Sequence, residues 1–524
     1  MTVDPKNPLT LARFVGREVV ATRSFDTHVF PSLAASLDRA RDTKRYARAV
    51  ILDGPALRDV LGVAVPEVQV SAVTNDSRAV SPGTAYVAIK GFTTDGAQFV
   101  PQALEQGATL IVADHPIDGA PTAVVPDTRA ALARVAVAVN GDPSKDLTVY
   151  GITGTNGKTT SSYVLHGILT GAYGAAKTGL LSTAEIIVGR DCQPAVRTTG
   201  EAPLVQGTLA RMRDEGVRYV VLETSSHGIA LQRVTGTHYA AALFTNLSRE
   251  HLDFHPTMED YYLTKRRLFE WTDGPKLANA DDEYGARLAA EIPGTLRFGT
   301  ASDADYRALG VVQTGAGTDF TLRTPTLELP LHMPLLGDYN VLNVTGAAAV
   351  ALETGMDPDR LQRAVAEMPQ VPGRFERVPN DRGIEIIVDY AHTDVGLAAV
   401  LDVARAVTHG RVIVVYGAAG RRDPAKRPKM GVVASDKADI GIITTDDSYD
   451  ESPETIAAEV KAGAPEHEVI LDRRSAIQKA LDYARPGDLV LLAGKGHERV
   501  QHLPDGDVDF HDATVATELL LDRG

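Results

Sequence analysis

Residues 151–160 read GITGTNGKTT, and this glycine-rich stretch decides the fold. An apolar run, DLTVYGIT, leads into it, and TTSSYVLHGILTGAYG, which is typical of a helix, follows it. Strand, loop and helix in this order are what a phosphate-binding loop requires. The commonest pattern, G-x-x-x-x-G-K-[ST], needs glycine where Ile152 stands, so this loop is a variant. An ordinary turn with a surface lysine is the alternative, and the flanking strand and helix favour a nucleotide site.

The loop and one later carboxylate predict where a nucleotide binds. Glycines let backbone N–H groups approach phosphate oxygens, and a helix N-terminus adds positive potential. Lys158 would bridge the β- and γ-phosphates of ATP, and Thr159 would place its hydroxyl on Mg²⁺. Glu223 ends the apolar run VRYVVLET, where a carboxylate can hold Mg²⁺. The predicted nucleotide contacts of the loop are Gly154, Thr155, Asn156, Gly157, Lys158, Thr159 and Thr160.

Composition limits the class of protein. The chain has 524 residues, 44% of them apolar and 23% charged, which is typical of a soluble protein of about three domains. No apolar run approaches the roughly 20 residues of a membrane span, and no signal peptide is evident. Cys192 is the only cysteine, which excludes a disulfide within the chain and fits a cytoplasmic location. A net charge of −15 argues against a nucleic-acid partner. We expect a monomer.

The pattern along the chain predicts an α/β fold. Short apolar runs separated by helical segments imply parallel sheets covered on both faces. We expect an N-terminal extension, a small α/β domain, a central phosphate-loop ATPase domain with a parallel sheet, and a Rossmann-like C-terminal α/β domain. Their predicted ranges are 1–55, 56–145, 146–335 and 336–524.

The loop sequence G-T-N-G-K-T-T resembles the ATP loop of the Mur ligases, bacterial enzymes that build the peptide of peptidoglycan. The resemblance extends from about residue 70 to residue 501 and is strongest to the members that add the third amino acid. It implies ATP and Mg²⁺ as cofactors, and UDP-MurNAc-L-Ala-D-Glu and an amino acid as substrates. The D-Glu side-chain carboxylate would be activated as an acyl phosphate and then attacked by the incoming amine. The segment 56–145 would bind the UDP-sugar.

The resemblance implies roles for residues that lie far apart in the sequence. His251, in TNLSREHLDFH, would bind a second Mg²⁺. Lys265, in MEDYYLTKRRLF, would carry CO₂ as a carbamate that helps to hold Mg²⁺. A carbamate forms from a neutral amine, so burial must lower the pKa of this lysine. Further nucleotide contacts would come from Asn279, Asn340, Arg374 and Asp389. Contacts to the UDP-linked substrate would come from Ser77, Thr198, Thr199, Ser225 and Arg233.

The C-terminal domain would select the amino acid. Arg422, in AAGRRDPAKRPKMG, matches an arginine that binds the substrate carboxylate, a task that suits its forked guanidinium. Gly494 and Glu498, in AGKGHERVQ, match residues that contact the amino acid.

One segment departs from the pattern of the members that add meso-diaminopimelate. Those members resemble one another in Asp-Asn-Pro-Arg, whereas this chain has Asp446, Asp447, Ser448 and Tyr449. The arginine for the distal carboxylate of diaminopimelate is missing, and Asp447 offers a negative charge instead. We therefore expect the added amino acid to end in an ammonium group, as L-lysine and L-ornithine do.

Three alternatives stay open. The chain could add meso-diaminopimelate, could be another Mur-type or folylpolyglutamate-type ligase, or could bind nucleotide without catalysis. The segments NDSR and TTGEA argue against a folate substrate. The presence of Lys158, Glu223, His251 and Lys265 together argues against loss of catalysis.

Overall fold

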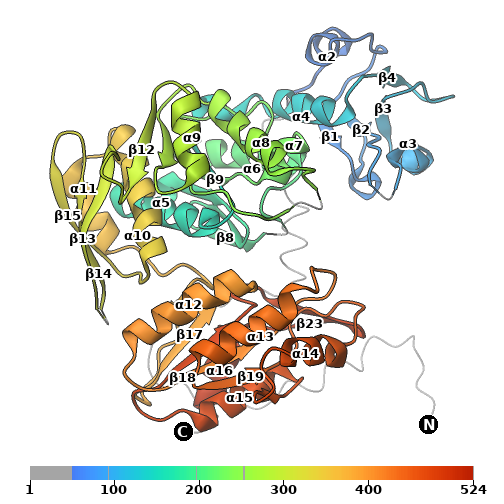
Figure 1. Ribbon diagram of the computed structural model, residues 1–524. Coiled ribbons are helices and arrows are strands. Elements are labelled where there is room, and N and C mark those ends of the chain that lie inside the picture. The colour runs from blue at the N-terminus through green and yellow to red at the C-terminus, as the bar shows by residue number, and fades with distance from the viewer. Residues whose placement is uncertain (1–49, 93, 196, 252–253, 315, 523–524) are drawn as a thin grey trace, which may run out of the picture. The chain divides into compact units, whose positions relative to one another are not determined.

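The structure is a computed structural model that describes residues 50–92, 94–195, 197–251, 254–314 and 316–522 (Figure 1). These residues all belong to one compact unit, Tyr46–Gly524. An extension is predicted over residues 1–55, and its residues 1–49 lie outside the described residues. Among the helices that the structure describes, none has the length and apolar character to span a membrane.

The first sheet has four parallel strands in the order β1-β2-β3-β4. Helix α4 packs its alanine- and valine-rich face against this sheet, and it begins at the Asp127 N-cap, whose carboxylate accepts two backbone N–H bonds. The elements are α2 (Gly54–Leu61), β1 (Ala72–Thr74), β2 (Thr84–Val87), α3 (Val100–Glu105), β3 (Ala108–Ala113), β4 (Thr122–Val124) and α4 (Thr128–Val139).

The middle sheet has eleven strands in the order β15-β14-β13-β12-β11-β10-β5-β9-β6-β7-β8. Its centre, from β6 to β13, is parallel, and antiparallel pairs form both edges. The strands are β5 (Thr148–Thr153), β6 (Thr178–Leu181), β7 (Glu185–Val188), β8 (Asp191–Pro194), β9 (Tyr219–Glu223), β10 (Ala241–Phe244), β11 (Lys276–Asn279), β12 (Thr295–Gly299), β13 (Tyr306–Thr314), β14 (Gly317–Arg323) and β15 (Glu328–Met333).

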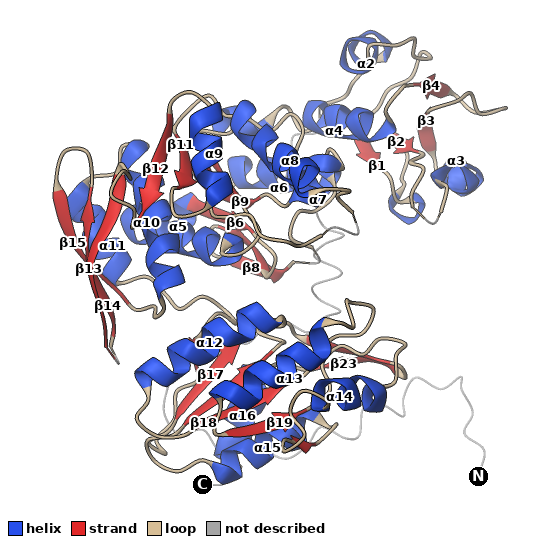
Figure 2. Ribbon diagram, in the orientation of Figure 1, coloured by secondary structure: helices blue, strands red, loops and turns tan. Residues whose placement is uncertain are grey.

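Helices cover both faces of the middle sheet (Figure 2). One face packs on α5, α10 and α11, and the other on α6 and α8. The core of this sheet continues through Leu361 and Val371, past the boundary predicted at residue 335, because α10 and α11 bury their apolar faces here. The helices are α5 (Lys158–Tyr173), α6 (Ala202–Asp214), α7 (Ser226–Ala230), α8 (Met258–Glu270), α9 (Glu283–Glu291), α10 (Asp338–Glu353) and α11 (Pro358–Ala366).

The third sheet has the order β16-β17-β21-β18-β19-β20 and is parallel except at β16. Helices α12, α13 and α14 pack on one face, and α15 and α16 on the other. The elements are β16 (Glu376–Arg377), β17 (Glu385–Asp389), α12 (Asp394–Val407), β18 (Val412–Tyr416), α13 (Lys426–Lys437), β19 (Ile440–Ile443), α14 (Pro453–Lys461), β20 (Glu468–Val469), α15 (Arg473–Tyr483), β21 (Leu489–Ala493) and α16 (Asp512–Leu521), with a hairpin of β22 (Val500–Leu503) and β23 (Gly506–Asp509).

The parallel sheets place the predicted site residues at strand ends. The carboxyl ends of neighbouring parallel strands meet at one edge of a sheet, where open α/β sheets bind ligands. In the middle sheet that edge carries the ends of β9, β5 and β10. In the C-terminal sheet it carries the ends of β17, β21, β18 and β19. The predicted α/β class with parallel sheets is confirmed.

Candidate active site

The glycine-rich loop joins β5 to α5 and is held by the segment that follows β10. The Thr155 N–H donates to the Asn246 carbonyl at 2.8 Å, and the Asn156 N–H donates to Asn246 Oδ1 at 2.9 Å. Gly154 has φ +149°, and a Cβ there would overlap the hydroxyl oxygen of Thr245. Glycine is therefore required at residue 154 for the loop to lie against the end of β10.

Gly154→Ala is expected to lower ATP affinity at least tenfold and to destabilise the protein by about 1–3 kcal/mol, a range typical of backbone strain. The added methyl group must push the loop away from Thr245. Calorimetric titration with ATP and thermal unfolding would measure the two effects. Gly207→Ala is the matched control, since a Cβ there has no neighbour within 4 Å. Unchanged ATP affinity in Gly154→Ala would contradict the assignment of the loop.

Glu223 lies at the end of β9 beside the start of α5. Its side chain is fully buried and accepts a hydrogen bond from the Thr159 hydroxyl at 3.0 Å. The Thr183 N–H donates to its second oxygen, also at 3.0 Å. Sequence reasoning missed Thr183, which carried no motif. A buried carboxylate beside the hydroxyl of a phosphate loop offers oxygen ligands of the type that Mg²⁺ prefers.

Lys265 is buried although the sequence around it reads as an exposed helix. Helix α8 places its ammonium 2.6 Å from the Gly154 carbonyl and 4.6 Å from the ring centre of Tyr261. Burial lowers the pKa of Lys265 well below its usual range, and the charge of Lys158 lowers it further. The pKa shift required for a carbamate is thus present. A neutral amine is available at lower pH than in an exposed lysine.

Lys158 and His251 lie near the same loop. The Lys158 ammonium donates to the Thr155 carbonyl at 2.7 Å. The centre of the His251 ring lies 6.1 Å from that of the Tyr261 ring. The same tyrosine contacts the Lys265 ammonium. His251 has φ +56°, a left-handed conformation that is uncommon outside glycine. The structure therefore brings the loop, Lys158, His251 and Lys265 together.

Two predicted nucleotide contacts also have structural partners. The Asn279 amide donates to the Thr245 carbonyl at 2.9 Å, and its oxygen accepts the Asp281 N–H at 3.0 Å. The Asn340 amide caps the Leu336 carbonyl at 2.7 Å. Each asparagine therefore stabilises a turn or helix end. Thr160 is buried in the first turn of α5.

Arg374 and Asp389 lie together on the C-terminal sheet. Asp389 ends β17, and its buried carboxylate accepts backbone N–H bonds from Phe375 at 2.7 Å and Ala391 at 2.8 Å. Burial raises the pKa of Asp389, whereas the charge of Arg374 opposes the rise. The Arg374 guanidinium lies 4.6 Å from the ring centre of Tyr390.

The residues predicted to bind the UDP-linked substrate form a second group in the middle domain. The Thr199 hydroxyl lies 3.0 Å from the Ser225 hydroxyl, and its carbonyl accepts from Arg233 at 3.2 Å. The Thr198 hydroxyl accepts from Thr183 at 3.0 Å, which connects this group to Glu223. Ser77 instead points into the first domain, where its hydroxyl donates to Gln102 Oε1 at 2.8 Å.

A cavity of about 300 Å³ adjoins this group. Three arginines line it, of which sequence reasoning singled out only Arg233 and missed Arg129 and Arg197. Arg197 directly precedes the predicted Thr198, so its position was the available signal. Arg197 and Arg233 both pair with Glu201, at 3.0 Å and 2.7 Å, and guanidinium groups of this kind also suit a polyanionic ligand. The remaining lining residues are Asn75, Tyr86, Ile89, Gly91, Phe92, Thr94, Gly96, Phe99, Glu201 and Leu231.

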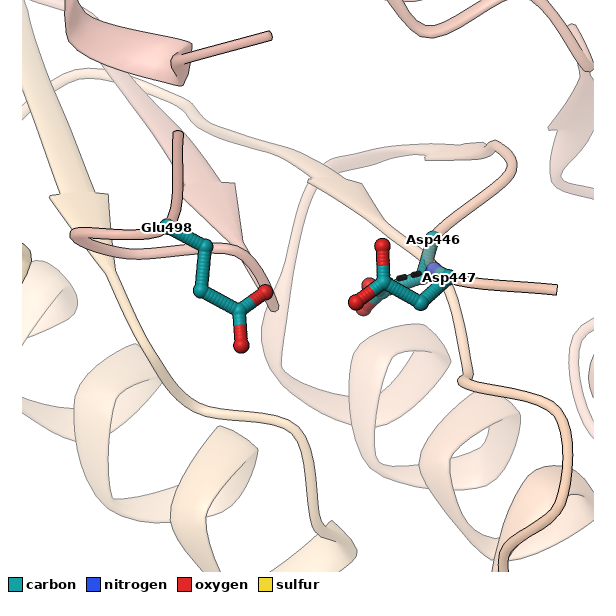
Figure 3. Close-up of side chains that lie close together, drawn as sticks. All are labelled: Asp446, Asp447 and Glu498. Atoms are coloured by element: carbon teal, nitrogen blue, oxygen red, sulfur yellow. Dashed lines mark hydrogen bonds between the residues drawn. The ribbon is translucent and has the colours of Figure 1, made fainter. Parts of the chain in front are cut away.

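Three carboxylates meet at the carboxyl edge of the C-terminal sheet (Figure 3). Asp446 and Asp447 follow β19, and Glu498 points toward them from the turn after β21, with one oxygen of each within 4.8 Å of the others. Lys495 lies among them, with its ammonium 2.7 Å from Asp447 Oδ1 and 2.8 Å from Glu498 Oε2. Sequence reasoning missed Lys495, although it stands in the quoted AGKGHERVQ segment.

The other predicted residues of this region lie at the same edge. Gly494 has φ +113°, and a Cβ there would lie 2.5 Å from Asp446 Oδ2. Arg422 is exposed in the loop between β18 and α13. Tyr449, at the position of the missing arginine, stacks on His502 with ring centres 5.1 Å apart.

Comparisons with known proteins cover almost all of this framework. The sequence matches the Mur ligase family catalytic domain over residues 69–152, the Mur ligase middle domain over 152–351 and the Mur ligase glutamate ligase domain over 373–496. A protein of Gloeobacter violaceus, named UDP-N-acetylmuramoyl-L-alanyl-D-glutamate–2,6-diaminopimelate ligase, is 39% identical over 469 residues, which cover 88% of this chain and 95% of that protein. A Streptomyces coelicolor protein of the same name is 39% identical over 489 residues, covering 88% and 95%.

Solved structures of Mur ligases share this fold. A structure of UDP-N-acetylmuramoyl-L-alanyl-D-glutamate–2,6-diaminopimelate ligase has a TM-score of 0.65 at 28% identity, covering 90% of this chain and 99% of that one. MurF ligase from Thermotoga maritima in complex with ADP has a TM-score of 0.56 at 20% identity, covering 86% and 96%, and shows the common fold. The chain therefore belongs to the Mur ligase family, as an ATP-binding, ADP-forming peptide ligase of peptidoglycan synthesis, and it is similar to members of the MurE type.

Proposed function

We propose that the chain adds the third amino acid, L-lysine or L-ornithine, to UDP-MurNAc-L-Ala-D-Glu. The observation that carries the ligase chemistry is the convergence of four side chains on one loop. Lys158 and Thr159 begin α5, Glu223 contacts Thr159, and the Lys265 ammonium contacts the carbonyl of Gly154. Such an arrangement suits phosphoryl transfer, which depends on positioning and on neutralising charge.

The reaction has two steps. An oxygen of the D-Glu side-chain carboxylate attacks the γ-phosphorus of ATP, and the bond to the bridging oxygen of ADP breaks. The amine of the incoming amino acid then attacks the carbonyl carbon of the acyl phosphate, and inorganic phosphate leaves with the bonding electrons. Lys158 would neutralise charge on the phosphates, and the loop N–H groups would hold them in line.

Mg²⁺ fits the residues around the loop. Glu223 is a fully buried carboxylate, and its neighbours include the Thr159 hydroxyl, an oxygen that Mg²⁺ accepts as a ligand. Glu223, Thr159, His251 and a carbamate on Lys265 would hold the metal ions. When bound, Mg²⁺ stabilises negative charge on the transferring phosphoryl group.

The arginine-lined cavity supports a UDP-linked acceptor. Arg129, Arg197 and Arg233 can pair with the two phosphates of UDP, with Glu201 as the competing anion for Arg197 and Arg233, and the exposed Phe92 offers an aromatic face for a uracil ring. Thr198 and Thr199 connect the cavity to Glu223, so a long acceptor bound there could extend toward the phosphate loop.

The amino acid is inferred from charge. The relatives at 39% identity are named as diaminopimelate ligases. In this chain the residue at the arginine position is Tyr449, and the adjoining cluster holds three carboxylates, Asp446, Asp447 and Glu498, against one buried cation, Lys495. Carboxylates attract an ammonium and repel a second carboxylate, which favours a diamino acid with one carboxylate over diaminopimelate.

Purified protein supplied with UDP-MurNAc-L-Ala-D-Glu, ATP and Mg²⁺ is expected to release ADP only when an amino acid is also present. L-Lysine or L-ornithine should give a kcat/KM at least tenfold above that for meso-diaminopimelate. Coupled ADP detection and mass spectrometry of the product would measure both. A preference for meso-diaminopimelate would overturn the amino-acid assignment, and ADP release without any acceptor would overturn the ligase assignment.

A further inference from the structure

Lys495 is a cation buried within the cluster of Asp446, Asp447 and Glu498, which the proposed function makes the amino-acid pocket. Its side chain is fully buried, and its ammonium donates three hydrogen bonds. The acceptors are Asp447 Oδ1 at 2.7 Å, Glu498 Oε2 at 2.8 Å and the Val500 carbonyl at 2.6 Å. A lysine ammonium has three N–H donors, so its donor capacity is filled within the protein. Lys495 therefore has no N–H left for a substrate.

The three carboxylates of the pocket differ because of this cation. Asp447 and Glu498 both pair with Lys495, and Glu498 also accepts the Tyr390 hydroxyl at 3.1 Å. Asp446 takes part in none of the ion pairs among the described residues, and one of its oxygens accepts the Asp447 N–H at 2.7 Å. From the sequence, we expected Asp447 to offer a negative charge to the amino acid. In the structure the carboxylate of Asp447 is instead paired with the Lys495 ammonium.

The turn that carries Lys495 also joins the pocket to the residues predicted to contact ATP. Tyr390 directly follows Asp389, and its ring lies beneath the Arg374 guanidinium. The Gly494 N–H donates to the Asp389 carbonyl at 3.0 Å. The turn that carries Lys495 and Glu498 is thus bonded to the end of β17, whose backbone holds Asp389.

We propose that Lys495 is a positioning residue, which holds Asp447 and Glu498 at the geometry that the incoming amino acid requires and offsets their mutual repulsion. The inference rests on the proposed function, because it assigns the pocket to the amino acid. The same geometry argues against a metal ion among these carboxylates, since the Lys495 ammonium already occupies the position between two of them. Burying two like charges without such a partner is costly.

Charged and titratable groups from other elements face the cluster. They are Tyr390, His392, Arg422, Lys426, Tyr449 and Arg473. Of these, histidine is the type whose ordinary pKa lies near neutrality, and burial lowers the pKa of His392 further. Burial also lowers the pKa of His497 on the same turn, and the charge of Lys495 lowers it further, so the double variant described below is needed to assign a new pH dependence to the carboxylates.

Lys495→Met keeps an unbranched side chain, one atom shorter, and removes its charge. Its KM for the amino acid is expected to rise at least tenfold at pH 7.5, with the KM for ATP within twofold of the unaltered protein. Burial raises the pKa of Glu498 and the charge of Lys495 opposes the rise, so without the cation Glu498 takes up a proton more readily, and the protonated carboxyl can hold the pair together at low pH. The KM for the amino acid should therefore rise between pH 6 and pH 8, while that of the unaltered protein stays flat.

The double variant Lys495→Met/Asp447→Asn tests charge directly, because it removes one carboxylate together with the cation. Its KM for the amino acid should depend less on pH between 6 and 8 than that of the single variant, since only Asp446 then remains beside Glu498. Lys437→Met, which breaks a more exposed ion pair with Asp402, is the matched control and should behave as the unaltered protein. Each variant is first shown to be folded by thermal unfolding.

The positioning role is overturned if Lys495→Met leaves the KM for the amino acid unchanged, if it raises the KM for ATP equally, or if the double variant keeps the pH dependence of the single one. The amino acid used is whichever the unaltered protein ligates. Failure of the proposed function would appear earlier, as absence of ligation by the unaltered protein. Preference for diaminopimelate would overturn the substrate assignment while leaving the Lys495 test valid.

Discussion

Lys265→Ala is expected to reduce kcat at least 10³-fold. This loss is at the upper end of the range found when one group that stabilises transition-state charge is removed. The side chain is buried against the phosphate loop, and burial lowers the pKa of Lys265, so the neutral amine can react with CO₂. Alanine cannot form the carbamate, which removes an anion that would help to hold Mg²⁺. Turnover is measured as amino-acid-dependent ADP release.

Chemical rescue separates a carbamate from a simple lysine. Acetate or formate should restore part of the activity of Lys265→Ala, because a small carboxylate can enter the vacated space, whereas excess bicarbonate should not. Lys265→Arg should stay inactive, since it keeps a cation that cannot be carbamylated. Lys145→Ala, at an exposed residue paired with Asp142, is the control and should retain full activity. Full activity in Lys265→Arg would exclude the carbamate role.

Glu223→Gln is expected to lower kcat by about 10²–10³ and to raise the Mg²⁺ concentration required for half-maximal activity. Glutamine has the same size and its oxygen can still accept the hydrogen bond from Thr159, so the change removes the charge and the acceptor for the Thr183 N–H with little change in packing. Steady-state rates over a range of Mg²⁺ concentrations measure both effects.

Glu283→Gln is the matched control, because Glu283 is exposed at the start of α9. It should leave kcat and the Mg²⁺ requirement unaltered. If Glu223→Gln keeps its normal Mg²⁺ requirement while losing activity, the carboxylate acts in some way other than holding the metal.

Local patterns in the sequence were sufficient for the elements and for the phosphate loop. The run before residue 154 became β5, the loop followed it, and α5 began at Lys158. The apolar run VRYVVLET likewise located β9. These features depend on neighbours within a few residues, so a single sequence can specify them.

The boundary after the middle domain depended on packing instead. Helices α10 and α11 follow residue 335 in the chain, yet their apolar faces complete the core beneath α5. Composition cannot show which sheet a helix covers, because an apolar face is compatible with either. The short stretch between β15 and α10 gave no signal that the middle core continues.

What the sequence alone determined was therefore the α/β class and the strand, loop and helix around residue 154, while the roles of Lys158 and Thr159 stay predictions. Only the tertiary structure decided that Lys265, 111 residues after Gly154 along the chain, is a buried lysine with a lowered pKa. Only the tertiary structure paired Lys495 with Asp447, 48 residues away, and so changed which carboxylate is uncompensated. The physical reason is that helix and strand patterns arise from near neighbours, whereas burial and charge pairing arise from segments that meet only when the chain folds.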